Sequence, residues 1–214
     1  MKQIINWHKC WTDNRIRFHE GKVNKFLEKY IQQFSLASGD SIFFPLCGKS
    51  YDMQWCIEQG FKVIGVELSE IAIQDFFTES EIDFKRSSNN NFNIYRSEHI
   101  TLYQGDYMDL TALDLKDCKL VFDRAAIIAI EAFNRPSYIN QLLAIIPSDT
   151  PILMISREYD QQRRSGPPFS VPLTEIKQLF NNPYQCRVLE DEQLSAKDGL
   201  QVLQRALKIS KLAQ

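Results

Sequence analysis

Residues with side chains suited to ligand binding stand where strand-like apolar runs of the chain end. Glu67, Asp106 and Arg124 each close or directly follow such a run, and another run leads into a turn that contains Gly48. A carboxylate can accept hydrogen bonds from both hydroxyls of a ribose. A guanidinium can bind a carboxylate through two parallel hydrogen bonds, or attract an anionic substrate. These residue types indicate a site for a small molecule that contains a ribose.

The spacing of two of these residues narrows the kind of nucleoside. Glu67 follows Gly48 by 19 residues, close to the interval of about 20 residues at which nucleotide-binding α/β domains place an acid for the ribose. A dinucleotide fingerprint needs three spaced glycines beside the pyrophosphate, whereas this turn has one, and the whole chain has 8. The sequence therefore favours a phosphate-free adenosine cofactor such as S-adenosylmethionine over a nicotinamide dinucleotide.

Strands and helices alternate along the chain, which must bring these residues together. Alternation of this kind predicts an α/β fold in which a doubly wound, mostly parallel sheet carries helices on both faces, with ligands at the carboxyl ends of the strands. We expect a polar loop at 87–93 and an antiparallel closing pair near the end of the chain. The expected strands are 42–47, 62–68, 92–96, 100–104, 119–123, 151–156, 185–190 and 200–209, and the expected helices are 50–59, 69–80, 136–146 and 173–181.

Length and charge limit the classes of protein that the chain can be. We expect its 214 residues to form one domain, with a helical segment at 1–40 covering the cofactor site and a core at 41–214. The 25 basic and 27 acidic residues provide no basic surface for a nucleic acid. No apolar run approaches the length of a membrane span, and the five cysteines are scattered without metal-ligand spacing. We expect a cytoplasmic monomer that binds neither membrane nor metal.

Several stretches of the sequence, taken together in this order and spacing, resemble the thiopurine S-methyltransferase family, and the bacterial members in particular. The similarity runs from about residue 7 to residue 181 and fades after about residue 190. The stretches are FFPLCGKSYDMQW (43–55), VIGVELSEIAIQDFF (63–77), GDYMDL (105–110), DRAAIIAI (123–130) and YDQQRRSGPPFSVP (159–172).

This resemblance implies a class I methyltransferase fold, Rossmann-like, with a seven-stranded sheet whose last strand is antiparallel. It also implies S-adenosyl-L-methionine as the methyl donor and a small thiol or other soft nucleophile as the acceptor. The positions that match cofactor contacts of the family are Trp11, Leu46, Glu67 and Arg124. The strand-end argument adds Pro45, Gly48 and Asp106. The residues expected on the substrate side are Phe18, Pro167, Pro168 and Phe169.

The expected chemistry needs little from the protein beyond alignment of the two reactants. The sulfonium of the cofactor is an activated methyl donor, and a thiol of low pKa is ionised at neutral pH without a strong base. The catalytic residues are therefore open, with Arg124 and Asp160 as candidates, and Asp106 as a further candidate base.

Three alternatives remain open from the sequence. The same fold and cofactor could serve methylation of inorganic selenium or tellurium species or of other small thiols, as in detoxification. A non-catalytic module could have kept the pocket, although Glu67 and Arg124 argue against it. A nicotinamide-dependent enzyme is disfavoured by the single glycine of the first turn.

Overall fold

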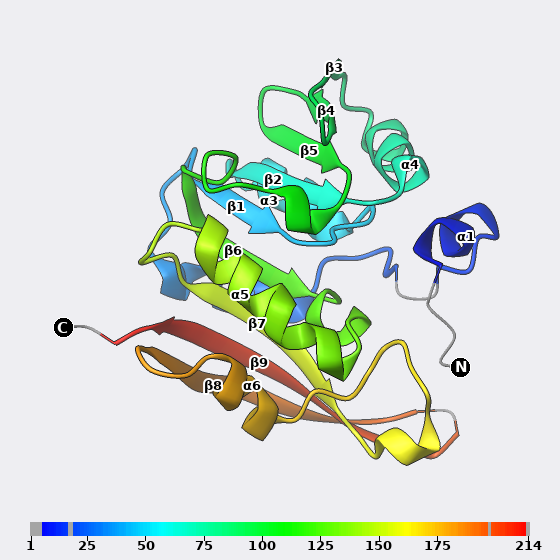
Figure 1. Ribbon diagram of the computed structural model, residues 1–214, viewed down its shortest axis with the longest axis vertical. Helices are drawn as coiled ribbons and strands as arrows, with labels where there is room; N and C mark the ends of the chain where they lie inside the picture. The colour runs from blue at the N-terminus through cyan, green and yellow to red at the C-terminus, as the bar shows by residue number, and fades with distance from the viewer. Residues whose placement is uncertain (1–5, 17–18, 197, 213–214) are drawn as a thin grey trace.

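A nine-stranded sheet runs through the computed structural model, which describes residues 6–16, 19–196 and 198–212 (Figure 1). Within these residues the strand order is β3-β4-β5-β2-β1-β6-β7-β9-β8. The five central strands β5, β2, β1, β6 and β7 are parallel, so their carboxyl ends meet at one edge. The strands are β1 (Ser41–Phe44), β2 (Lys62–Glu67), β3 (Lys85–Ser88), β4 (Asn93–Arg96), β5 (Ile100–Gln104), β6 (Cys118–Arg124), β7 (Ile152–Glu158), β8 (Tyr184–Ser195) and β9 (Gln201–Lys211).

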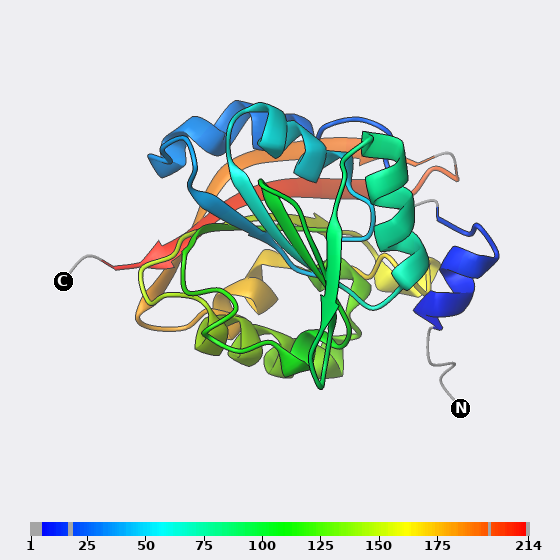
Figure 2. The same cartoon turned by 90° about the horizontal axis from the view of Figure 1, so that it is seen from above.

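Helices cover both faces of this sheet, as the alternating sequence pattern predicts (Figure 2). One apolar core joins α2, α3 and α4 to the sheet, and a second core joins α5 and α6 to the opposite face. The helices are α1 (Trp7–Thr12), α2 (Lys25–Tyr30), α3 (Tyr51–Glu58), α4 (Glu70–Ser80), α5 (Arg135–Ile145) and α6 (Leu173–Leu179). The short 3-10 helices are η1 (Ile31–Phe34), η2 (Tyr107–Asp109), η3 (Ile127–Ala129), η4 (Ala132–Asn134) and η5 (Gln161–Arg163).

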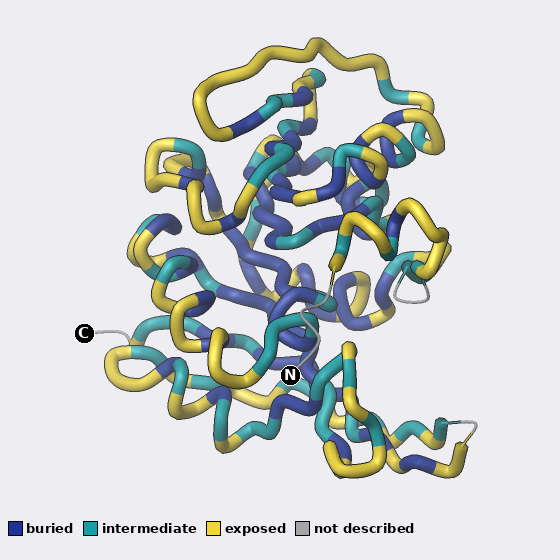
Figure 3. The backbone as a smooth tube through the Cα atoms, turned by 45° about the vertical axis from the view of Figure 1, so that its right-hand side comes forward, coloured by how far each residue is buried: buried dark blue, intermediate teal, exposed yellow. Residues whose placement is uncertain are grey.

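Antiparallel strands extend the sheet at its two sides, and of these strands only β3 lies outside the strands expected from the sequence. β3 and β4 extend it beyond β5, and β9 and β8 extend it beyond β7. The doubly wound α/β class is confirmed, but the described sheet has nine strands rather than seven, and its pairings are as often antiparallel as parallel. The predicted loop at 87–93 overlaps β3, whose four residues are all exposed and show no apolar alternation. Figure 3 shows the exposed backbone around this hairpin at the top of the molecule.

Local signals in the sequence set two of the helix starts. The Ser50 side chain accepts a hydrogen bond from the Asp52 backbone N–H and so caps α3. Pro136 lies in the first turn of α5, where its missing N–H costs no helical hydrogen bond. Both helices begin within one residue of the predicted position. Among the described helices, none combines the length and the apolar character needed to cross a bilayer.

The N-terminal helices lie in two different places. α2 and η1 pack onto the sheet beside α3 and contribute to one of its two cores. α1 lies beside α4 at the edge of the molecule, outside both cores (Figure 1). The division into a covering segment at 1–40 and a core at 41–214 stays a prediction. Within the segment 1–40, α1 is the helix nearest the carboxyl edge of the sheet.

Candidate functional site

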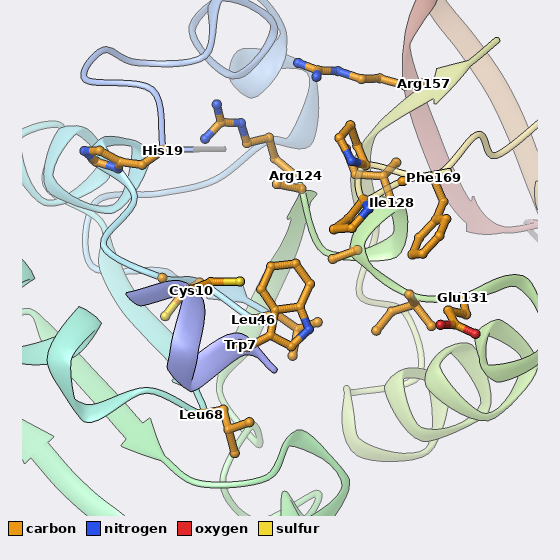
Figure 4. Close-up of a pocket in the computed structure, with 18 of the residues that line it drawn as sticks. Trp7, Cys10, His19, Leu46, Leu68, Arg124, Ile128, Glu131, Arg157 and Phe169 are labelled. Carbon is orange, nitrogen blue, oxygen red and sulfur yellow. The ribbon is translucent and has the colours of Figure 1, made fainter. Parts of the chain in front are cut away.

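A cleft of about 2040 Å³ opens at the carboxyl edge of the parallel strands (Figure 4). Segments that follow β1, β2, β5, β6 and β7 line it, and α1 with residues 13–15 and 19–20 forms another wall. Sites for single drug-sized ligands are about 300–1,000 Å³. The cleft therefore has room for two small molecules side by side.

Glu67, the last residue of β2, presents a buried carboxylate to this cleft. Its Oε2 accepts a hydrogen bond from the Gly48 backbone N–H at 2.9 Å, and its Oε1 accepts one from the Ser69 N–H at 2.8 Å. Burial raises the pKa of the Glu67 carboxyl, and these backbone N–H groups oppose the shift. Each carboxylate oxygen keeps a lone pair for a second donor, such as a ligand hydroxyl.

The turn after β1 allows backbone to reach the cleft closely. Gly48 has a φ of +54°, and a Cβ at this position would lie 3.1 Å from the Trp11 ring. Leu46 also has a positive φ, +48°, which is uncommon for a residue with a side chain. The turn thus brings backbone, the buried Trp11 of α1 and Glu67 to one part of the cleft.

Arg124, at the end of β6, lies between two carboxylates. Its guanidinium is 2.7 Å from Glu20 and 3.6 Å from Asp52, which is only 1% exposed. Asp52 also accepts hydrogen bonds from the Asn24 N–H and the Ser50 hydroxyl. Burial raises the pKa of the Asp52 carboxyl, and the Arg124 charge lowers it. Arg124 is therefore oriented into the cleft by a buried carboxylate behind it.

A buried hydrogen-bonded pair supports the turn that follows Arg124. The Asp123 carboxylate accepts hydrogen bonds from the Ile127 N–H at 3.0 Å and from the Tyr138 hydroxyl at 2.9 Å. Burial raises the pKa of Asp123 to about 6. These bonds tie the turn with Ala125 at φ +65° to α5. The pair holds Arg124 and the cleft-lining Ile128 in place.

The loop after β7 forms a proline and aromatic wall on the other side of the cleft. Gly166 has a φ of +81°, and a Cβ there would lie 2.4 Å from the Phe169 ring, so no larger residue fits. The Phe169 N–H donates to the Ile128 carbonyl at 2.6 Å, and the Tyr159 hydroxyl donates to the Pro168 carbonyl. The wall therefore has a fixed position relative to the end of β6.

The cleft brings together most of the residues expected from the sequence. Pro45 and Asp160 do not line it; Asp160 is exposed and caps η5 by accepting the Gln162 N–H. The catalytic candidate Asp160 therefore has no contact with the cleft in this structure. Phe18 lies outside the described residues. The expected residues that line the cleft are Trp11, Leu46, Gly48, Glu67, Asp106, Arg124, Pro167, Pro168 and Phe169.

Sequence reasoning missed four residues of this region: Glu20, Asp52, Arg157 and Gln204. Arg157 lies near the end of β7, so the strand-end rule that selected Arg124 could have found it. The other three are positioned by tertiary contacts that leave no local pattern. Among the described residues, no group of three or more histidine, cysteine, aspartate or glutamate side chains is arranged to hold a metal ion.

Comparison with known sequences shows a match to one family. The chain matches the family model described as thiopurine S-methyltransferase over residues 3–210. It is 42% identical over 179 residues to a thiopurine S-methyltransferase of Marinobacter nauticus, covering 84% of this chain and 82% of that protein. It is 38% identical over 201 residues to one of Azotobacter vinelandii, covering 94% of this chain and 92% of that protein.

Solved structures share the fold at low sequence identity. A methyltransferase of Methanosarcina mazei described as SAM-dependent has a TM-score of 0.66 at 12% identity, covering 90% of this chain and 100% of that one. The 1,6-didemethyltoxoflavin-N1-methyltransferase of Burkholderia thailandensis, solved with S-adenosylhomocysteine, has a TM-score of 0.65 at 13% identity, covering 95% and 85%. These similarities identify a methyltransferase fold.

Proposed function

Because the chain belongs to the thiopurine S-methyltransferase family, we propose that its cleft transfers a methyl group to the sulfur of a thiopurine or related heteroaromatic thiol. The chain is an S-adenosylmethionine-dependent methyltransferase. One observation supports the placement of the reaction most strongly. The buried Glu67 carboxylate and the Arg124 guanidinium, at the ends of β2 and β6, open into the same cleft as the Phe169 wall.

The residues of the cleft fit S-adenosylmethionine. The Glu67 carboxylate would accept hydrogen bonds from the ribose hydroxyls, and Arg124 would bind the carboxylate of the methionine part. Because Gly48 has no Cβ, the space beside the Trp11 ring stays open, and a close-fitting cofactor would need this space. Asp106 and Leu68 line the cleft beyond Glu67 and would bound the adenine. The cofactor supplies an activated methyl group on a sulfonium.

The protein's own contribution is to position the acceptor and exclude water. Phe169, Pro167 and Pro168 would hold a flat heteroaromatic ring against the wall opposite Glu67. Trp11 would cover the ligands from the side of α1, where an indole face attracts a nearby cation. No strong base is required, because an aromatic thiol is ionised near neutral pH.

A turnover assay with a panel of acceptors tests this function. Purified protein with S-adenosylmethionine should convert 6-mercaptopurine and benzenethiol to S-methyl products, with one S-adenosylhomocysteine released per product. Turnover of selenite or tellurite alone would instead support the detoxification alternative. Calorimetric binding of S-adenosylhomocysteine with no turnover of any acceptor would support a non-catalytic module and reject the proposal. We expect the protein to be cytoplasmic, in keeping with its five free cysteines, and we expect it to act as a monomer.

A further inference from the structure

A second arginine, Arg157 of β7, lies in the cleft beside the wall proposed to contact the acceptor. The Val171 N–H donates to the Arg157 carbonyl at 2.7 Å, which ties Arg157 to the segment that follows Phe169. Figure 4 shows the Arg157 side chain extending toward Arg124, with Ile128 and Phe169 along the same side of the cleft. In the strand order β2-β1-β6-β7, Arg157 on β7 is farther than Arg124 on β6 from Glu67 on β2. Arg157 therefore belongs to the acceptor half of the cleft.

The contacts of Arg157 leave its charge incompletely paired. The Gln204 side chain accepts a hydrogen bond from Nε at 3.3 Å, and the nearest Glu20 oxygen is 3.5 Å from a terminal nitrogen. Within the described part of the chain, no other acceptor bonds this guanidinium. Burial lowers the pKa of Arg157, because its charge is partly removed from water. An anionic group of a ligand beside Arg157 would replace the stabilisation of its charge that burial takes away from water.

The single carboxylate of Glu20 is shared between the two arginines. It is 2.7 Å from Arg124 and 3.5 Å from Arg157, so both guanidinium groups face one point in the cleft. In the pair of Arg157 and Glu20 the side chains are 33% and 38% exposed, and an ion pair of this exposure contributes little to stability. Glu20 thus marks a position where a carboxylate is favourable and can be exchanged for another.

We propose that Arg157 determines acceptor specificity by binding an anionic group, so that the cleft prefers aromatic thiols that carry a carboxylate. This inference rests on the proposed function. The Phe169 wall contacts the ring of the acceptor, and Arg157 forms two parallel hydrogen bonds with its carboxylate. Arg124 remains with the carboxylate of the cofactor. Glu20 competes with the acceptor for Arg157 and leaves it when the acceptor binds.

A matched pair of acceptors isolates the carboxylate. With 2-, 3- and 4-sulfanylbenzoate and their neutral methyl esters, the wild type should show a higher kcat/KM for at least one acid than for its ester. Arg157→Gln should reduce this preference about tenfold or more, through KM rather than kcat. Arg157→Lys should restore part of it. Arg163→Gln removes the same charge from an exposed position outside the cleft and should leave the preference unchanged.

A second substitution acts in the opposite direction. Glu20→Gln removes the competing carboxylate, so at saturating cofactor it should lower the KM for the acid relative to the KM for the ester. A purely structural ion pair predicts no such selective gain. An unchanged or raised ratio of the acid KM to the ester KM in Glu20→Gln, or an unchanged preference in folded Arg157→Gln, would overturn the proposal.

Direct binding separates this inference from the proposed function. In calorimetric titrations of the complex with S-adenosylhomocysteine, 2-sulfanylbenzoate should bind more tightly than its methyl ester, and Arg157→Gln should remove the difference. This result can hold even if no thiol is methylated, in which case the proposed function fails and the anion site stands. Methylation of neutral thiols with no binding preference for any of the three acids rejects the anion site alone.

Discussion

Glu67→Gln is the substitution that tests the cofactor site most sharply. Charge-assisted hydrogen bonds contribute about 1.5–3 kcal/mol each. The glutamine keeps one acceptor oxygen, so we expect it to lose about 1.4–3 kcal/mol of binding, a Kd for S-adenosylhomocysteine that is about 10- to 150-fold higher. Because the carboxylate also accepts the Gly48 and Ser69 N–H groups, one of these donors then faces an amide NH₂.

The same substitution has two opposing effects on stability. An unsatisfied buried N–H costs about 1–3 kcal/mol, equivalent to a Tm lower by about 2–12 °C for a chain of this size. Burial raises the pKa of Glu67, so removing its charge returns part of this cost. We expect a Tm decrease at the low end of that range, with the fold retained.

Isothermal titration with S-adenosylhomocysteine and its 2′-deoxy analogue measures the expected contact. In the wild type, loss of the hydroxyl should weaken binding, whereas in Glu67→Gln it should cost much less, since the two changes remove the same hydrogen bond. Glu58→Gln, at an exposed position of α3, is the control. A folded Glu67→Gln protein with the wild-type Kd, or with the full penalty for the deoxy analogue, would refute the ribose assignment.

Two further substitutions test the remaining parts of the site. Arg124→Gln should raise the Kd for S-adenosylhomocysteine at least about tenfold, but leave that for 5′-methylthioadenosine, which lacks the carboxylate, nearly unchanged; equal losses for both ligands would contradict the assignment. The folded-state pKa of Asp123, about 6, is raised above its ordinary value of 3.8. The native state therefore holds this proton more tightly than the unfolded state does. The free energy of unfolding should fall by roughly 3 kcal/mol as pH rises from about 4 to about 6. Urea unfolding across this range should show that this component is absent in Asp123→Asn, and an identical pH dependence in both proteins would reject the buried-carboxylate explanation.

The central strands were predictable because their apolar runs carry the signal of burial on both faces. Runs such as 62–68 and 119–123 have little polar character. Ser50 marks a clear start for α3, the helix between β1 and β2. β3 lacked any such signal, because its four residues are all exposed and none is apolar, although its backbone pairs with β4. Edge strands of this kind are determined by a neighbouring strand rather than by their own residues.

Within the site, the sequence identifies residues at strand ends but not those that arrive from elsewhere. Glu67 and Arg124 stand at fixed distances from recognisable runs, so their meeting at one edge follows from the parallel sheet. Glu20 comes from the segment before α2, and Gln204 from an antiparallel strand whose register with β7 no local pattern encodes. The positive φ of Leu46 is likewise set by the tertiary position of the turn.

The placement of α1 outside both apolar cores predicts that the cleft can open at α1 without unfolding of the sheet. Of the residues of α1, only Trp11 is buried, whereas α2 inserts Phe26 and Leu27 into a core. A six-residue helix is too short to be stable by itself. We expect detachment of α1 to expose the Trp11 indole and to break the contacts of α1 with α4, without opening either apolar core. Hydrogen exchange in α1 should then be faster than in β1 and β6, whose exchange reports global unfolding. We propose that ligand entry and product release proceed through this local opening, with the sheet intact.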